Sequence, residues 1–158
     1  MIRFHYSNIY DMNLARWLGC VWNIINETQG KAYSSQIQLV WNEREKIIKP
    51  SFQRLKLILP SVVTGYIVSA WDGMTAFSDP LTIPIYENNK MAIVKIIHEL
   101  VHTCLSYEKN KEIKDSIYSH LNEKYASESR AVRIHIAVNS LQEAVMQNSQ
   151  DLLQLLEK

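Results

Sequence analysis

Glycine and proline are scarce in this sequence, and their positions divide the chain. The 158 residues include 4 glycines and 4 prolines, of which Gly73 and Pro84 are the last. These two residue types are the strongest breakers of a helix. We therefore expect the part of the chain after Pro84 to be mostly helical. The chain also lacks internal repeats, low-complexity segments and a Gly/Pro-rich linker, and its length fits a single domain, 1–158.

Paired cysteines and long apolar runs are also missing. Cys20 and Cys104 form no C-x-x-C pair, which excludes a cysteine zinc knuckle. Each lies in a helical apolar pattern, which predicts buried, reduced thiols. No stretch approaches 18 uninterrupted apolar residues, and no signal peptide is visible at the N-terminus. We therefore expect a cytoplasmic protein with no membrane partner.

An excess of charge of either sign is absent as well. The chain has 17 Lys and Arg residues against 16 Asp and Glu residues, so its net charge is +1. Such a balance produces no global field that would attract nucleic acid, and we expect no nucleic-acid partner. The hydrophobic fraction of 47% is sufficient for a buried core.

Two helices and three strands are expected in the first half of the chain. Apolar spacing predicts a helix from Asp11 to Thr28, with Asp11 as its N-cap and Gly30 as its stop signal. A second helix is slightly favoured from Ser34 to Lys49, closed by Pro50. The three predicted strands are Arg54–Leu59, Thr64–Trp71 and Leu81–Tyr86. Pro84 cannot donate a backbone hydrogen bond, which favours the sheet edge for the third strand.

The clearest helix in the second half is Met91–Tyr107. Its predicted apolar side consists of Ile93, Ile96, Ile97, Leu100, Cys104 and Leu105. A polar stretch, Ser106–Lys111, follows, and helical patterning then resumes and runs nearly to the C-terminus, with a bend expected within it. We expect the apolar tail Asp151–Lys158 to pack as a last helical turn, with a cover over a cleft or partner surface as the alternative. The order of elements predicts an α+β domain, in which helices back a small, three-stranded sheet.

Chemistry is indicated by the pentapeptide His98-Glu99-Leu100-Val101-His102 inside this helix. Residues four apart share a helix face, so His98 and His102 can direct ring nitrogens at one metal ion. Glu99 lies about 100° around the helix, where a base can take a proton from zinc-bound water. A chance match in a chain of this composition has a probability of roughly 1%.

The motif, the strand before it and a later Glu-x-x-Ala helix resemble the zincin metallopeptidases, specifically the gluzincin branch. The resemblance covers roughly Leu81 to Leu141. It implies one Zn²⁺ per chain, a downstream glutamate as third ligand, and a glutamate helix packed beside the motif helix. It also implies that the edge strand holds a peptide substrate in extended form.

Two segments compete for the third ligand. Glu128-Ser-Arg-Ala131 resembles the glutamate helix of small bacterial and phage metallopeptidases linked to repressor cleavage and stress response. Glu123, in Leu-Asn-Glu-Lys-Tyr-Ala, resembles a segment of aminopeptidase-N-type enzymes but lacks their glycine. On one continuous helix, Glu128 would lie at the centre of an apolar stripe and Glu123 about 140° away. A buried carboxylate needs a partner such as zinc, which favours Glu128 over Glu123.

The other three histidines receive weaker predictions. His135 lies seven residues after Glu128 and on the same helical face, which suits either a contact near the metal or a hydrogen-bonded core position. His120 is a minor candidate for the third ligand. His5 lies near a terminus that is expected to fray and receives no role.

The function predicted from these residues is zinc-dependent hydrolysis of peptide bonds in a peptide or protein substrate. His98, His102 and Glu128 would bind zinc, and Glu99 would act as general base. One alternative is a catalytically silent, zinc-containing regulatory or peptide-binding module. A second is an interaction protein in which the motif is only part of the core.

Overall fold

The computed structural model describes residues 2–22, 24–69 and 76–148, and within them the protein is α+β. The chain divides into two compact units. The first consists of Met1–Glu43 and Ser61–Glu99, and the second of Arg44–Pro60 and Leu100–Lys158. The long helices α2 (Ile24–Arg54) and α3 (Asn89–Ser106) contribute residues to both units. The expectation of one domain, 1–158, stays a prediction.

A four-stranded mixed sheet forms the centre of the first unit. Its strands are β1 (Ile2–Tyr6), β2 (Val63–Val68), β3 (Phe77–Ser78) and β4 (Leu81–Pro84), in the order β1-β2-β4-β3. β1 and β4 run parallel to β2, with Ile2 opposite Val63 and Gly65 opposite Leu81, whereas β3 is antiparallel to β4. A parallel pair needs a long crossover, and α1 and α2 supply it between β1 and β2.

The sheet differs from the three strands predicted. β1 was not expected, yet its buried Ile2 and Phe4 alternate with exposed Arg3 and His5, as in a half-buried strand. The predicted strand Arg54–Leu59 does not form, because Arg54 is the last residue of α2 and the residues after it form a turn and loop.

The third predicted strand exists but is not an edge strand. β4 pairs with β2 on one side and with β3 on the other. Its pairing with β3 stops at Thr82, before Pro84. The amide of Ile85 donates to Val68 of β2 at 3.0 Å, so the nitrogen of Pro84 faces the opposite side, beyond the end of β3. The missing N–H of Pro84 therefore costs the sheet no hydrogen bond.

Helix α1 (Asn8–Leu18) starts earlier and ends sooner than predicted. Ser7 is its N-cap and accepts a bond from the amide of Tyr10, and Gly19, with φ of 73°, ends it in the left-handed region. Asp11, the predicted cap, instead lies within the helix and is fully buried. Its carboxylate accepts hydrogen bonds from the Tyr6 hydroxyl, the Trp22 indole, and both the amide and the hydroxyl of Ser69.

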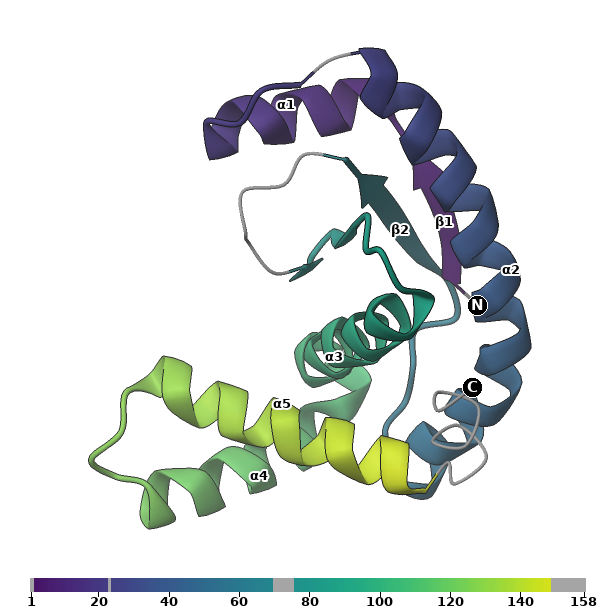
Figure 1. Ribbon diagram of the computed structural model, residues 1–158. Coiled ribbons are helices and arrows are strands. Elements are labelled where there is room, and N and C mark those ends of the chain that lie inside the picture. Colours follow the sequence, from purple (N-terminus) through teal and green to yellow (C-terminus); the bar gives the residue numbers. More distant parts are fainter. Residues whose placement is uncertain (1, 23, 70–75, 149–158) are drawn as a thin grey trace. The chain divides into compact units, whose positions relative to one another are not determined.

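Helix α2 includes the end of the first predicted helix and all of the second, and it continues through Gly30 and past Lys49 to Arg54. Gly30 lies inside α2 and does not end it. The glycine instead makes room for the ring of Tyr6, which a Cβ at this position would overlap. The side chain of Gln38 binds the backbone of β1, accepting from the amide of Phe4 at 2.8 Å. Figure 1 shows α2 running alongside β1 and β2. Pro50 lies inside the last two turns.

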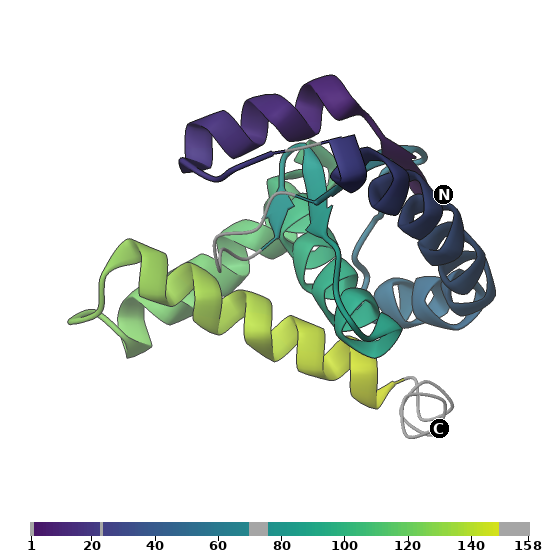
Figure 2. The same ribbon diagram turned by 45° about the horizontal axis from the view of Figure 1, so that its top comes forward.

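The second unit is helical, as predicted. α3 is followed by a short 3₁₀ turn (Glu108–Asn110), α4 (Lys111–Lys124) and α5 (Arg130–Gln147), and the last two form an antiparallel hairpin (Figures 1 and 2). Every residue of the apolar side predicted for Met91–Tyr107 is buried. The buried side chain of Asn110 bonds the amide and carbonyl of Ile58 and the carbonyl of Cys104, all within 2.9 Å. These bonds fix the end of α3 to the segment after α2.

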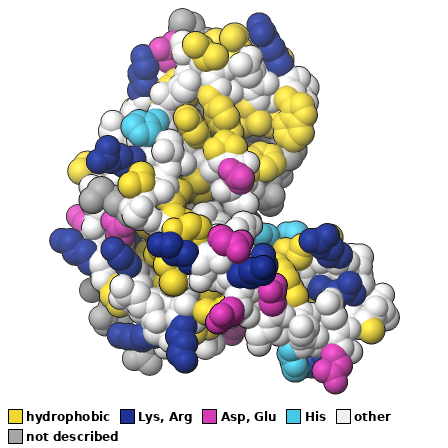
Figure 3. All heavy atoms as spheres, turned by 180° about the vertical axis from the view of Figure 1, so that it is seen from behind, with side chains coloured by type: hydrophobic (Ala, Val, Ile, Leu, Met, Phe, Trp, Pro, Cys, Tyr) yellow, Lys and Arg dark blue, Asp and Glu magenta, His cyan; other side chains and the backbone are white. Residues whose placement is uncertain are grey.

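The surface carries mixed charge, as the composition suggests. On the face shown in Figure 3, Lys and Arg side chains are interspersed with Asp and Glu. None of the described helices is long and apolar enough to cross a membrane. The predicted helical turn Asp151–Lys158, and Trp71 at the end of a predicted strand, lie outside the described residues.

Candidate metal centre

The motif helix presents His98 and His102 on its partly exposed side. Both side chains are half-buried, as is Lys95 one turn earlier, while Ile97, Leu100 and Val101 beside them are buried. His98 lies one turn before His102, so the helix itself sets their relative positions. The sharing of one face, predicted from the spacing, is therefore confirmed.

The third side chain at this face is His135 of α5. Ligand nitrogens of His98, His102 and His135 all lie within 4.8 Å of one another. The rings of His102 and His135, both in the second unit, have centroids 5.5 Å apart and planes at 76°. The three imidazoles thus form a cluster of the size needed for one ion.

Local bonds orient the His135 ring. Ser129 caps α5 by accepting from the amide of Val132, which starts the helix six residues before His135. The Nδ1 atom of His135 lies 3.0 Å from the carbonyl of Ala131. Because a carbonyl can only accept, Nδ1 is the donor in this bond, which leaves Nε2 as the nitrogen that would bind a metal. A histidine that binds a metal through Nε2 needs this tautomer.

The donor set fits a transition-metal ion, and zinc in particular. Three protein ligands with a fourth position for water are typical of catalytic zinc sites, and neutral imidazole is a preferred donor. Nitrogens around a tetrahedral zinc lie about 3.4 Å apart, given bonds of about 2.0–2.1 Å. Zinc binding would therefore require the three nitrogens to approach one another from their spacing of up to 4.8 Å.

Glu99 lies on the buried side of the same helix, with 5% of its surface exposed. Burial raises the pKa of its carboxyl to about 7, against a smaller lowering by the nearby Lys95 ammonium. Its place directly after His98 puts it beside the histidine face instead of on it.

A residue near Glu99 that the sequence did not single out is Tyr86. Burial is the largest cause, and together with Tyr33 and the Glu99 carboxylate it raises the pKa of the Tyr86 phenol to about 12. Its backbone amide donates to the Tyr33 hydroxyl at 3.4 Å. Tyr86 follows β4 and had been predicted only as the end of a strand, because nothing in its local sequence indicates a partner 13 residues later.

Glu128, the preferred third ligand, lies elsewhere. α4 ends at Lys124 and α5 begins at Arg130, so Glu128 is in the exposed turn between them. Its amide donates to the carbonyl of Tyr125, and its own carbonyl accepts from Arg133. The prediction of one continuous helix, on which Glu128 would be buried, was therefore wrong. Among the described residues, the cluster of possible metal ligands contains His135 and not Glu128.

The remaining candidates are also outside this cluster. Glu123 is exposed on α4, and His5 is exposed on β1. His120 lines a pocket between α4 and α5. The sequence signal for His135 was its place on the same helical face as Glu128, which did not distinguish a contact near the metal from a core position.

Comparisons of this chain with protein-family models, with curated proteins and with solved structures find no match.

Proposed function

We propose that this protein is a zinc-dependent hydrolase of the zincin type that cleaves peptide bonds. The observation that supports it is the convergence of three imidazoles beside a buried carboxylate on the His98–His102 helix. His98, His102 and His135 would hold one zinc ion per chain. His135 takes the place that the resemblance to gluzincins had given to Glu128.

The reaction divides between the metal and the protein. Bound zinc supplies Lewis acidity, which activates a water molecule and polarises a carbonyl. The Glu99 carboxylate accepts the proton of the attacking water and later delivers a proton to the nitrogen of the leaving amine. His98, His102 and His135 fix the position of these events relative to Glu99. The Ala131 carbonyl keeps His135 in the tautomer that binds.

A peptide or protein substrate follows from the resemblance of the motif to metallopeptidases. The cytoplasm is the proposed location, since Cys20 and Cys104 are both free thiols, which suits a reducing compartment.

The deciding experiment combines metal analysis with a single substitution. The purified protein should contain one zinc per chain and cleave an unfolded protein such as casein. Glu99→Gln should retain the zinc and lose hydrolysis by a factor of at least 10², because it removes the base but keeps the shape.

A matched control is Glu123→Gln, which changes an exposed glutamate on α4 and should leave both zinc and activity unchanged. Equal cleavage by Glu99→Gln and the parent would refute the proposed role of Glu99. Bound zinc without cleavage in the parent would favour the alternative of a silent regulatory or peptide-binding module. Absence of zinc would point to a motif that is only part of the core.

A further inference from the structure

A pocket of about 440 Å³ lies between α4 and α5. Its floor is apolar: Leu121 and Ala137 are buried, and Ile117, Ile136 and Leu141 are half-buried. Pockets that hold small molecules generally have volumes of roughly 300–1,000 Å³ and such apolar linings. The floor can therefore take an apolar group.

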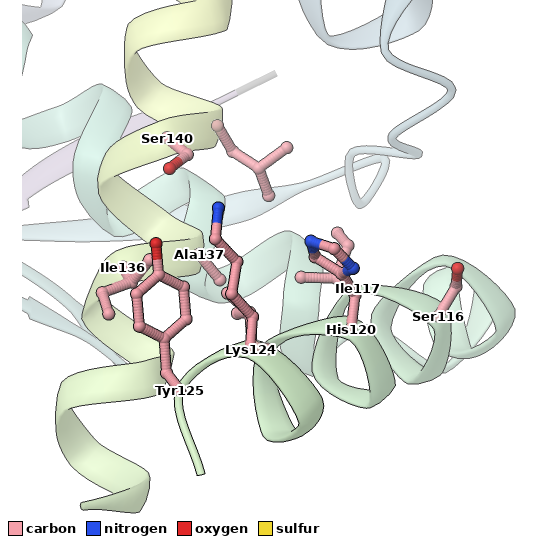
Figure 4. A pocket seen from close by; sticks show the side chains of 10 residues that line it. Ser116, Ile117, His120, Lys124, Tyr125, Ile136, Ala137 and Ser140 are labelled. Atoms are coloured by element: carbon pink, nitrogen blue, oxygen red, sulfur yellow. The ribbon is translucent and has the colours of Figure 1, made fainter. Parts of the chain in front are cut away.

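The rim of this pocket is polar and carries positive charge. Lys124, His120 and Ser140 are exposed at it, and Tyr125 is half-buried. In Figure 4, Lys124, His120 and Tyr125 extend from α4 toward α5, and the Lys124 amine points toward Ser140. The Lys124 ammonium lies 5.4 Å from the centre of the Tyr125 ring. None of the residues that line the pocket is acidic.

This pocket is separate from the histidine cluster. Counting about 100° per residue along α5, the lining residues Ile136, Ala137, Ser140 and Leu141 lie between about 100° and 240° from His135. They occupy the opposite side of the helix from the ring that meets His102. A ligand here would not compete for the metal, and the inference does not depend on the proposed function.

We propose that the α4–α5 pocket binds a carboxylate attached to a small apolar group. The Lys124 ammonium attracts the carboxylate, and the ring N–H of His120 and the hydroxyls of Tyr125 and Ser140 can donate hydrogen bonds to it. The apolar body covers Leu121 and Ala137. Two sources share this chemistry: a free medium-chain acid, and the C-terminal residue of a peptide with an apolar side chain.

The test follows backbone amide chemical shifts by NMR while the intact protein is titrated with octanoate. Octanoate should shift the amides of residues 136–141. Octylamine, which has the same chain but the opposite charge, and acetate, which lacks the chain, should each bind at least ten-fold more weakly. Acetyl-leucyl-leucine and its C-terminal amide form the second pair of probes. Binding of this peptide acid together with failure of its amide would support the carboxylate site and identify a peptide C-terminus as a source.

Two pairs of variants localise the effect. Lys124→Gln should weaken octanoate binding about ten-fold, whereas Lys111→Gln, exposed on the same helix and outside the pocket, should not. Ser140→Trp should block the pocket mouth, whereas Ser119→Trp, exposed on α4 outside the pocket, should not. Equal binding of octanoate and octylamine would overturn the proposal, as would equal effects of the two members of either pair. If the purified parent protein contains no zinc but still binds octanoate, only the proposed hydrolase function is refuted.

Discussion

His135 is an exposed side chain whose ring is nevertheless oriented by local contacts. It contacts the ring of His102 and bonds the carbonyl of Ala131 through Nδ1. Such bonds raise metal affinity because the ligand loses less freedom on binding. The imidazole thus has a geometric basis as a ligand that the exposed Glu128 lacks.

Substitution of His135 is expected to weaken zinc binding strongly. His135→Ala removes one of three protein ligands, and we predict at least a hundred-fold loss of zinc affinity, since even outer partners of ligands contribute 10–100-fold. Competition with a chromophoric chelator measures the affinity directly. Circular dichroism on the same samples shows whether the fold is retained.

Glu128→Ala and His120→Ala are the matched controls, because both positions are exposed and lie outside the histidine cluster. Both variants should bind zinc as the parent does. A large loss for Glu128→Ala with none for His135→Ala would restore the ligand set expected from the sequence.

Site residues that are close together in the sequence could be predicted, whereas a site residue far along the chain could not. His98, Glu99 and His102 could be placed relative to one another because one helix sets their geometry. The third side chain depends on the turn between α4 and α5, where Ser129 restarts the helix and Arg133 bonds the carbonyls of Tyr125 and Glu128. That turn contains neither glycine nor proline, so a bend could be expected in this region but its position could not be predicted.

Among the helices, α3 was predicted well, whereas the bounds of α2 were not. The apolar spacing of α3 identified its buried side because burial follows the helical period over five turns. Gly30 in α2 was interpreted as a stop signal, which is its commonest meaning near a helix end. Its actual role, close contact with the Tyr6 ring of β1, depends on a residue 24 positions earlier.

The substitution Gly30→Ala tests this packing role through the sign of the change in the free energy of unfolding. In an isolated helix this change would stabilise by about 1 kcal/mol. Here the new Cβ would overlap a ring whose hydroxyl is tied to Asp11, so the ring cannot simply move aside. We therefore expect a lower free energy of unfolding, measured by chemical denaturation.

The double-variant comparison uses Tyr6→Ala, which removes the ring. In that background Gly30→Ala should become stabilising, because only the helix preference remains. A stabilising effect of Gly30→Ala in the parent protein would show that the glycine is not required for packing.

For the molecule as a whole, four tyrosines couple stability to alkaline pH. Burial raises the pKa of Tyr33 and Tyr118, and burial with neighbouring acidic groups raises the pKa of Tyr6 and Tyr86 to about 12. The reference value is 10.0, so as pH rises the unfolded chain loses these protons before the folded one does. Their contribution to stability is complete below pH 10 and is lost as the pH approaches 12.

The free energy of unfolding should accordingly fall between pH 10 and pH 12. Guanidinium denaturation at several pH values measures it, and absorbance at 295 nm reports tyrosinate formation in the same samples. A buried tyrosine outside the metal cluster, Tyr33, offers a check: Tyr33→Phe removes one ionisable proton and should make the fall shallower. A free energy of unfolding that stays constant from pH 10 to pH 12 would contradict the raised pKa values of these tyrosines.

The parallel pairing of β1 with β2 also has a consequence for how the chain folds as it is made. Ile2 pairs with Val63, about 60 residues later. At 5–20 residues per second, synthesis reaches β2 about 3 to 12 s after β1. During this interval Ile2 and Phe4 lack the neighbouring strand, and pairing with another chain would lead to aggregation. Arg3 and His5, which alternate with them, interrupt the apolar run and protect the nascent strand until its partner is synthesised.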